Sequence, residues 1–204
     1  VKVEIIETRT VGPTLGQDSK DKSQFAFVIG LGAVVIFMIC FYRLSGFIAD
    51  VALMAYTILL LGILYLMDAT LTLPGVAGII LSIGMAVDAN VLIFEHFKEE
   101  YQINQKSLRL AMDAGFSRAF TTIFDSNVTT LIAAGVLFFL GTGTIRGFAI
   151  TLGVGTMLSM FTAITLTQYL LKLMINSKLS DSPSLYGANG FMLGTKKKGA
   201  EKNA

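Results

Sequence analysis

Charged residues, cysteine and histidine are scarce in this sequence, and each shortage excludes a class of protein. Of the 204 residues 15% are charged, whereas a soluble domain usually carries about a quarter. The only cysteine, Cys40, excludes an internal disulfide. It stands apart from the only histidine, His96, so no cluster has metal-ligand spacing and no metal site is expected. The formal net charge of +2 is too small to indicate nucleic-acid binding.

Motifs for two kinds of catalysis are also missing. The sequence contains no glycine-rich P-loop motif, so it is not expected to hydrolyse nucleotides by that route. The apolar runs contain Ser and Thr, but no His or Lys is placed where it would activate one of them for intramembrane proteolysis. We therefore predict a protein that is not an enzyme and that has no cofactor.

Long apolar runs, in contrast, are abundant, and 53% of the residues are hydrophobic. Five runs each have about the 20 residues that a helix needs to cross the hydrocarbon of a bilayer. They are continuously apolar rather than alternating, which favours helices over barrel strands. The runs are Phe25–Tyr42, Phe47–Met67, Leu73–Phe97, Phe120–Leu140 and Ile145–Met174. We predict an all-α membrane protein with a five-helix transmembrane bundle.

The two ends differ from this middle part. Residues 1–18 are predicted to be the end of an extramembrane domain and a linker, because Val1–Val11 alternates like a strand and Gly12-Pro13 interrupts it. Residues 19–178 form the predicted transmembrane domain, and the polar residues 179–204 a disordered tail. Ser107–Phe116 is predicted to be a short separate amphipathic helix that stops near Gly115. Since the first residue is not Met, we expect a piece of a longer protein.

Lys and Arg are concentrated in loops on one side of the predicted bundle. This side carries Arg43, Lys98, Lys106, Arg109, Arg118, Lys172 and Lys178. The opposite loops contain Arg146 and Asp68. Because basic loops of membrane proteins tend to stay in the cytoplasm, we predict that Val1 lies outside and Ala204 in the cytoplasm.

An aspartate interrupts the third apolar run, in the stretch MAVDANVLIFEHFKEE (Met85–Glu100). Placing a carboxylate in hydrocarbon costs about 2.5 kcal/mol or more, which favours a functional role for Asp88. The alternative is that Asp88 reaches the membrane interface. The acidic residues and His96 at the end of this run are expected to lie at the cytoplasmic interface, as is Asp50, one turn inside the second run.

The spacing of Asp88-Ala-Asn90-Val91 recurs in the next run as Asp125-Ser-Asn127-Val128. Because successive spans are antiparallel and both aspartates lie on the cytoplasmic side of the midplane, we predict that the four polar side chains share one layer. Arg118 precedes Asp125 by seven positions and lies on the same helix face. It is a candidate for the same proton-coupling site, and the alternative is that Asp125 simply pairs with Arg118 near the headgroups.

Small residues indicate where helices pack closely. Gly84 lies in the third run, and Gly147, Thr151, Gly155 and Ser159 recur at four-residue steps in the last. Plain helix packing is favoured over a proton path for this stripe.

Four segments of the sequence resemble the SecD side of the SecD/SecF family, which belongs to the resistance-nodulation-division superfamily. They are ETRTVGPTLGQDS (Glu7–Ser19), LTLPGVAGIILSIGMAVDANVLIFEHFKEE (Leu71–Glu100), AFTTIFDSNVTTLIAA (Ala119–Ala134) and GTGTIRGFAITLGVGTMLSMFTAIT (Gly141–Thr165). The resemblance implies the second to sixth helices of a six-helix half-transporter, with a first helix and most of a periplasmic domain upstream. It also implies a location in the bacterial cytoplasmic (inner) membrane.

The resemblance further implies that the complex uses the proton gradient to promote export of polypeptides. Asp88 would then carry the proton-driven function, and Asp125 would contribute in its similar context. The implied partners are SecF as the other half, the SecYEG channel, a YidC-type insertase, the exported polypeptide and membrane lipid, with no nucleic acid. Two rival functions are a proton-coupled small-molecule exporter of the same superfamily and a non-conducting scaffold of the translocon.

Overall fold

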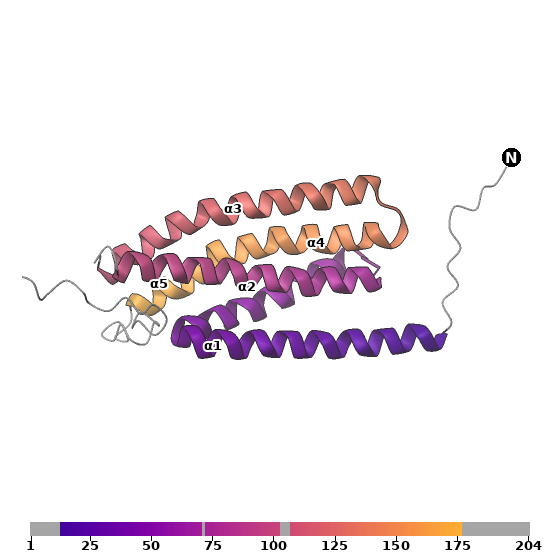
Figure 1. Cartoon of the computed structure of the whole chain (residues 1–204), viewed down its shortest axis with the longest axis horizontal. Helices are drawn as coiled ribbons and strands as arrows, with labels where there is room; N and C mark the ends of the chain where they lie inside the picture. The colour runs from indigo at the N-terminus through magenta and orange to yellow at the C-terminus, as the bar shows by residue number, and fades with distance from the viewer. Residues whose placement is uncertain (1–12, 71, 103–106, 177–204) are drawn as a thin grey trace, which may run out of the picture.

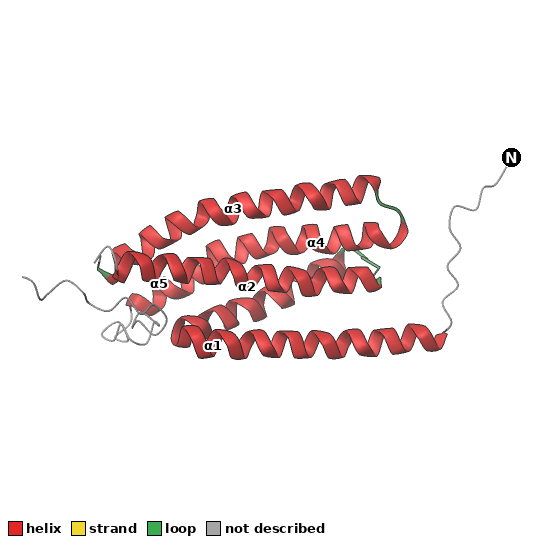
Figure 2. Cartoon of the chain, in the orientation of Figure 1, coloured by secondary structure: helices red, strands yellow, loops and turns green. Residues whose placement is uncertain are grey.

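Helices account for almost all of the computed structural model, which describes residues 13–70, 72–102 and 107–176. The elements in chain order are α1 (Pro13–Leu66), α2 (Leu73–Gln102), α3 (Leu108–Leu140), α4 (Gly143–Phe161), the π-helix η1 (Thr162–Thr167) and α5 (Gln168–Asn176). Figure 2 shows short loops after α1 and α3, whereas α4, η1 and α5 follow one another without a loop, and no strand occurs in the described residues. The predicted all-α fold is confirmed.

The helix α1 folds back on itself at Arg43. This residue has a φ of 50° and a ψ of −114°, which are not helical values. A Cβ atom added at Gly46 would collide with the carbonyl oxygen of Met38, although residues eight apart lie about 12 Å from each other along a straight helix. The chain therefore reverses here, and Figure 1 shows the two arms of α1 leaving the turn in the same general direction.

Four helices of the described chain are long and apolar enough to cross a membrane. The sequence predicts five spans, and the difference lies in α1. Its first arm (residues 13–42) contains the first predicted run, and its second arm (residues 44–66) contains most of the second. Helix α1 therefore includes two of the five predicted spans. The other three spans correspond to α2, to α3 and to α4 continued through η1 and α5.

The helices form an elongated bundle in which α2, α3 and α4 run side by side (Figure 1). The loop residues 67–70 and 141–142 lie at one end of the bundle, and the turn at Arg43 lies with α5 at the other. Helix α2 packs most extensively against α4 and then against α3, while α1 packs mainly against α2. The largest fully buried side chains at these contacts include Leu53, Tyr56, Leu60, Ile93, Phe94 and Ile123.

Large apolar side chains also cover the outside of the bundle. Phe25, Tyr65 and Phe139 are 70%, 82% and 79% exposed, and many Leu and Ile side chains accompany them. Soluble proteins rarely expose such continuous apolar surface, which instead suits a bilayer.

Two predicted boundaries differ from the structure. Helix α3 begins at Leu108 and continues past Gly115 without a break, so the prediction of a separate short helix at 107–116 is wrong. Gly115 lies at a close crossing, because a Cβ there would meet the backbone of Phe97 in α2. At the other boundary, residues 13–18 of the predicted linker belong to α1. The predicted strand at 1–11 and the predicted tail at 179–204 lie outside the described residues.

Candidate functional site

Asp88 lies on an outward face of α2. Its side chain is exposed, and Leu81 and Gly84 are exposed on the same face, seven and four positions earlier. A Cβ added at Gly84 would meet no atom within 4 Å. Gly84 is predicted to pack against another helix, but it packs against none within the described chain. This face therefore presents a carboxylate next to a glycine, with room for a further helix.

Asn90 points into the bundle instead. It is 3% exposed, and its Oδ1 accepts a hydrogen bond of 2.8 Å from the hydroxyl of Thr167 at the end of η1. Successive helical residues are rotated by about 100°, so residues two apart point in nearly opposite directions. The bond between α2 and η1 therefore lies directly behind the exposed Asp88.

The same division recurs in α3. Asp125 is exposed, whereas Asn127 is 7% exposed and donates from Nδ2 to the carbonyl oxygen of Ile123 at 2.7 Å. Both carboxylates are thus exposed and both amides buried, and no hydrogen bond joins any two of these four side chains in the described chain. That the four share one layer stays a prediction. The repeated spacing places one carboxylate outside and one amide inside on each helix, because two residues rotate the side chain by more than half a turn.

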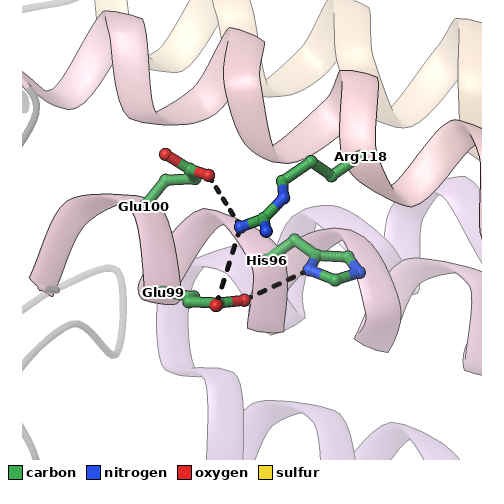
Figure 3. Close-up of polar contacts among 4 residues, drawn as sticks. All are labelled: His96, Glu99, Glu100 and Arg118. Carbon is green, nitrogen blue, oxygen red and sulfur yellow. Dashed lines mark hydrogen bonds and ion pairs between the residues drawn. The ribbon is translucent and has the colours of Figure 1, made fainter. Parts of the chain in front are cut away.

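Arg118 forms ion pairs with the end of α2. Its Nη1 lies 2.9 Å from Glu100 Oε1 and 3.6 Å from Glu99 Oε1, and His96 Nδ1 lies 3.5 Å from Glu99 Oε2 (Figure 3). Among the described residues no ion pair joins Arg118 to Asp125, so the alternative in which these two pair near the headgroups is not seen. Arg118 joins α2 to α3 at the end of the bundle that carries the turn at Arg43.

Replacing Arg118 with Ala is expected to lower the stability of the assembled protein by about 1–3 kcal/mol. The Glu100 side chain is 4% exposed, so it would keep its burial and lose its guanidinium partner. Thermal unfolding of the full-length protein in detergent or nanodiscs would measure the change. Arg109→Ala removes an exposed arginine from the same helix and serves as the control. Equal midpoints for the two variants would contradict the prediction.

A second polar contact fixes the turn of α1 to α2. The hydroxyl of Tyr42 donates to Glu95 Oε1 at 3.0 Å, and Lys98 Nζ donates to the same oxygen at 2.9 Å. Lys98 Nζ also lies 4.3 Å from the centre of the Tyr42 ring. From the sequence Glu95 is expected at the cytoplasmic interface, and Tyr42 is not among the predicted site residues. A tyrosine at the end of an apolar run is the signal that was available, since its hydroxyl needs a partner when buried.

The small-residue stripe of α4 lies against α2. A Cβ at Gly155 would meet Ser82, and a Cβ at Gly147 would meet Thr72. Thr151 fills the space opposite Gly78, and Ser159 is fully buried. Tyr56 of α1 also reaches this contact, because its hydroxyl donates to the carbonyl oxygen of Gly155 at 3.3 Å. The backbones of α2 and α4 therefore approach each other closely along this stripe.

Neither the pocket described next nor any group of metal-ligating side chains in the described residues adds a further candidate site. A pocket of about 240 Å³ lies between α2, α3, η1 and α5, lined mainly by apolar side chains such as Phe116 and Ile164, and none of the predicted site residues lines it. Within the described ranges no group of three His, Cys, Asp or Glu residues is placed to hold a metal ion.

Comparison with known proteins gives a consistent family match. The family model described as protein export membrane protein SecD/SecF, C-terminal, matches residues 1–177. The chain is 62% identical over 191 residues to protein translocase subunit SecD of Acidaminococcus fermentans, covering 94% of this chain and 46% of that protein. It is 51% identical over 189 residues to the Synechocystis SecD subunit, covering 92% and 40%.

A solved structure shares the fold. The crystal structure of SecDF, a translocon-associated membrane protein from Thermus thermophilus, superposes with a TM-score of 0.79 at 40% identity. It covers 82% of this chain and 23% of that chain. The chain thus spans less than half the length of each of these relatives.

Proposed function

The chain belongs to the SecD/SecF family of protein-export membrane proteins, and on this premise we propose that it forms part of a machine that uses the proton gradient to promote polypeptide export. The main support for this proposal is the position of Asp88. A carboxylate on an apolar span, exposed next to a glycine on an open face, is costly in lipid and suited to a site completed by a partner helix.

The open face of α2 is where we place the partner. A second half-transporter helix, which we propose belongs to SecF, would cover Asp88 and pack against Gly84. The assembled pair would then adjoin the SecYEG channel, with a YidC-type insertase as a further neighbour. We infer that the proton gradient, rather than a bound cofactor or a chemical reaction of this chain, supplies the energy.

Proton binding would act through helix packing. Behind Asp88, Asn90 is bonded to Thr167 at the end of the π-helix η1, and π-helical turns often occur at functional sites. Neutralising Asp88 would remove a charge from the partner interface and change the relative stability of two packings of α2. We propose that Asp125, on the exposed side of α3, contributes to the same proton coupling.

The proposal is tested by export from vesicles that contain the full-length protein with its partner subunits and channel. A proton gradient is expected to accelerate release of an exported polypeptide, and an uncoupler is expected to remove that acceleration. Export that is equally fast with and without a gradient would favour the scaffold. Gradient-driven movement of a small molecule without any effect on the polypeptide would favour the exporter.

We also propose the membrane orientation, with the Arg43 turn and α5 in the cytoplasm of a bacterium and the loops at 67–72 and 141–142 outside. Cysteine labelling of the full-length protein in a Cys40→Ser background tests it. An impermeant reagent is expected to label the Thr142→Cys variant in intact cells and the Ser107→Cys variant only after permeabilisation, since both positions are exposed. The reverse pattern would overturn the orientation. Ser45, next to the Arg43 turn, would be a poor labelling position for the cytoplasmic side because it is 1% exposed.

A further inference from the structure

A second carboxylate of the spans has no role in the function proposed above. Asp50, in the second arm of α1, is 6% exposed, and neither of its oxygens has a hydrogen-bond partner in the described chain. The hydroxyl of Ser45, five positions earlier and 1% exposed, is also unpartnered. The sequence predicts Asp50 at the membrane interface, and the structure adds that its side chain is buried between helices. Buried side-chain groups normally find partners, so this carboxyl group needs an explanation.

The position of Asp50 along the bundle follows from one contact on the same helix. Tyr56 Oη lies 3.3 Å from the carbonyl oxygen of Gly155. The second arm of α1 and α4 run in opposite directions (Figure 1), so six residues back from Tyr56 corresponds to six residues forward from Gly155. Asp50 therefore lies level with Phe161, where α4 ends and η1 begins. The second arm is thus packed next to a π-helical segment at the depth of an unpartnered carboxyl group.

No cation of the described chain forms an ion pair or a hydrogen bond with Asp50. From α4 through η1 the charged residue is Arg146, near the opposite end of α4. On α5, Lys172 is exposed and lies 3.3 Å from Asp113. On α2, Lys98 is bonded to Glu95. The remaining titratable or charged side chains on these elements near this end are Cys40, Tyr42, Arg43, Tyr56, Asp88, His96, Glu99, Glu100, Tyr101 and Tyr169.

The energy of burial decides between the two forms of the group. An ionised carboxylate taken out of water without a partner costs several kcal/mol, and this cost is not offset here by a paired charge. The neutral carboxylic acid costs much less, and it gains an O–H donor that the ionised form lacks. The neutral form is therefore the one compatible with this packing.

We propose that Asp50 is a proton-binding site distinct from Asp88, occupied in this conformation and able to release its proton to water where the contact between the second arm of α1 and η1 opens. Its ligand is the proton itself. The site depends on the membrane location of the chain and on the packing of α1, and not on what the complex transports. Failure of the export proposal would therefore leave it standing.

Infrared spectroscopy of the full-length protein with its partner subunits in lipid vesicles tests the proposal at neutral pH. The wild-type spectrum is expected to contain a carboxylic acid C=O band that shifts in D₂O and that is lost in the Asp50→Asn variant. The Asp68→Asn variant, which changes an exposed loop residue, is expected to keep the band. Loss of an ionised carboxylate band from the Asp50→Asn spectrum, in place of the acid band, would overturn the proposal.

Stability provides a second readout. Asn and Val resemble the neutral acid in charge and approximate size, so Asp50→Asn and Asp50→Val are expected to assemble with unfolding midpoints close to wild type or higher. If both variants fail to assemble, Asp50 is an ionised partner of a cation elsewhere in the complex, and the proposal is wrong.

Discussion

Asp88→Asn is expected to abolish the part of polypeptide export that depends on the proton gradient, while the protein still assembles with its partners. The amide has nearly the shape of the carboxyl group but cannot bind and release a proton. Because Asp88 is exposed in this chain and makes no hydrogen bond or ion pair with the described residues, its replacement removes nothing from the helix packing. Moving one charge through 100 mV releases about 2.3 kcal/mol, and the variant would lose this coupling.

The measurement compares gradient-stimulated release of an exported polypeptide from vesicles that contain the wild-type or the variant complex. Asp68→Asn is the matched control, since it makes the same change in the loop between α1 and α2. Asp68 has a positive φ of 48°, a conformation that Asn tolerates well. Asp88→Glu keeps a titratable group one methylene away and is expected to retain partial activity. Full gradient stimulation of an assembled Asp88→Asn complex would show that Asp88 has a structural role only.

Gly155→Leu is expected to prevent α2 and α4 from packing together and so to eliminate correctly assembled protein. A Cβ at this position would already lie 2.5 Å from Ser82 Cβ and 3.1 Å from the hydroxyl oxygen of Tyr56. Three helices meet there, so no single side chain can move aside without disturbing another contact. Overpacking of a core usually costs about 1–3 kcal/mol, and a branched side chain in a backbone contact is at or beyond the upper end.

A graded series makes this prediction specific. Gly155→Ala is expected to destabilise the protein less than Leu but measurably. Gly153→Ala in the same helix is expected to be neutral or stabilising by up to about 1 kcal/mol, since its Cβ would meet Ala134 at an ordinary 3.7 Å. Adding Ser82→Gly to Gly155→Ala removes the two closest opposing atoms and leaves the Tyr56 hydroxyl in place, so it is expected to restore part of the lost stability. Unfolding midpoints that do not distinguish Gly155→Ala from Gly153→Ala would contradict this account of the contact.

The stripe at Gly147, Thr151, Gly155 and Ser159 shows how far sequence patterns reach for packing. Four-residue spacing correctly marks one helix face, but it does not say which helix approaches it. The repeated Asp-x-Asn-Val spacing places α2 beside α3, and these two helices do pack together, but α4 is the more extensive neighbour of α2. Which helices pack against each other depends on the shapes of several helices at once, and the sequence of one segment does not contain this information.

The sequence by itself determined that this protein is a bundle of membrane-crossing helices. Length and continuous hydrophobicity are local properties, and a backbone in hydrocarbon must satisfy its hydrogen bonds within its own segment. The same reasoning located the carboxylate of Asp88 within an apolar span, since its cost depends on the residues around it in the chain.

Only the tertiary structure decided which polar groups face inward. Asp88 is exposed while Asn90 behind it is buried, and Asp50 is buried without a hydrogen-bond partner in the described chain. Arg118 is likewise joined to Glu100 rather than to Asp125. The physical reason is that burial and pairing belong to contacts between helices. A rotation of one helix by two residues, about 200°, would exchange the inner and outer faces without changing the hydrophobicity of the span.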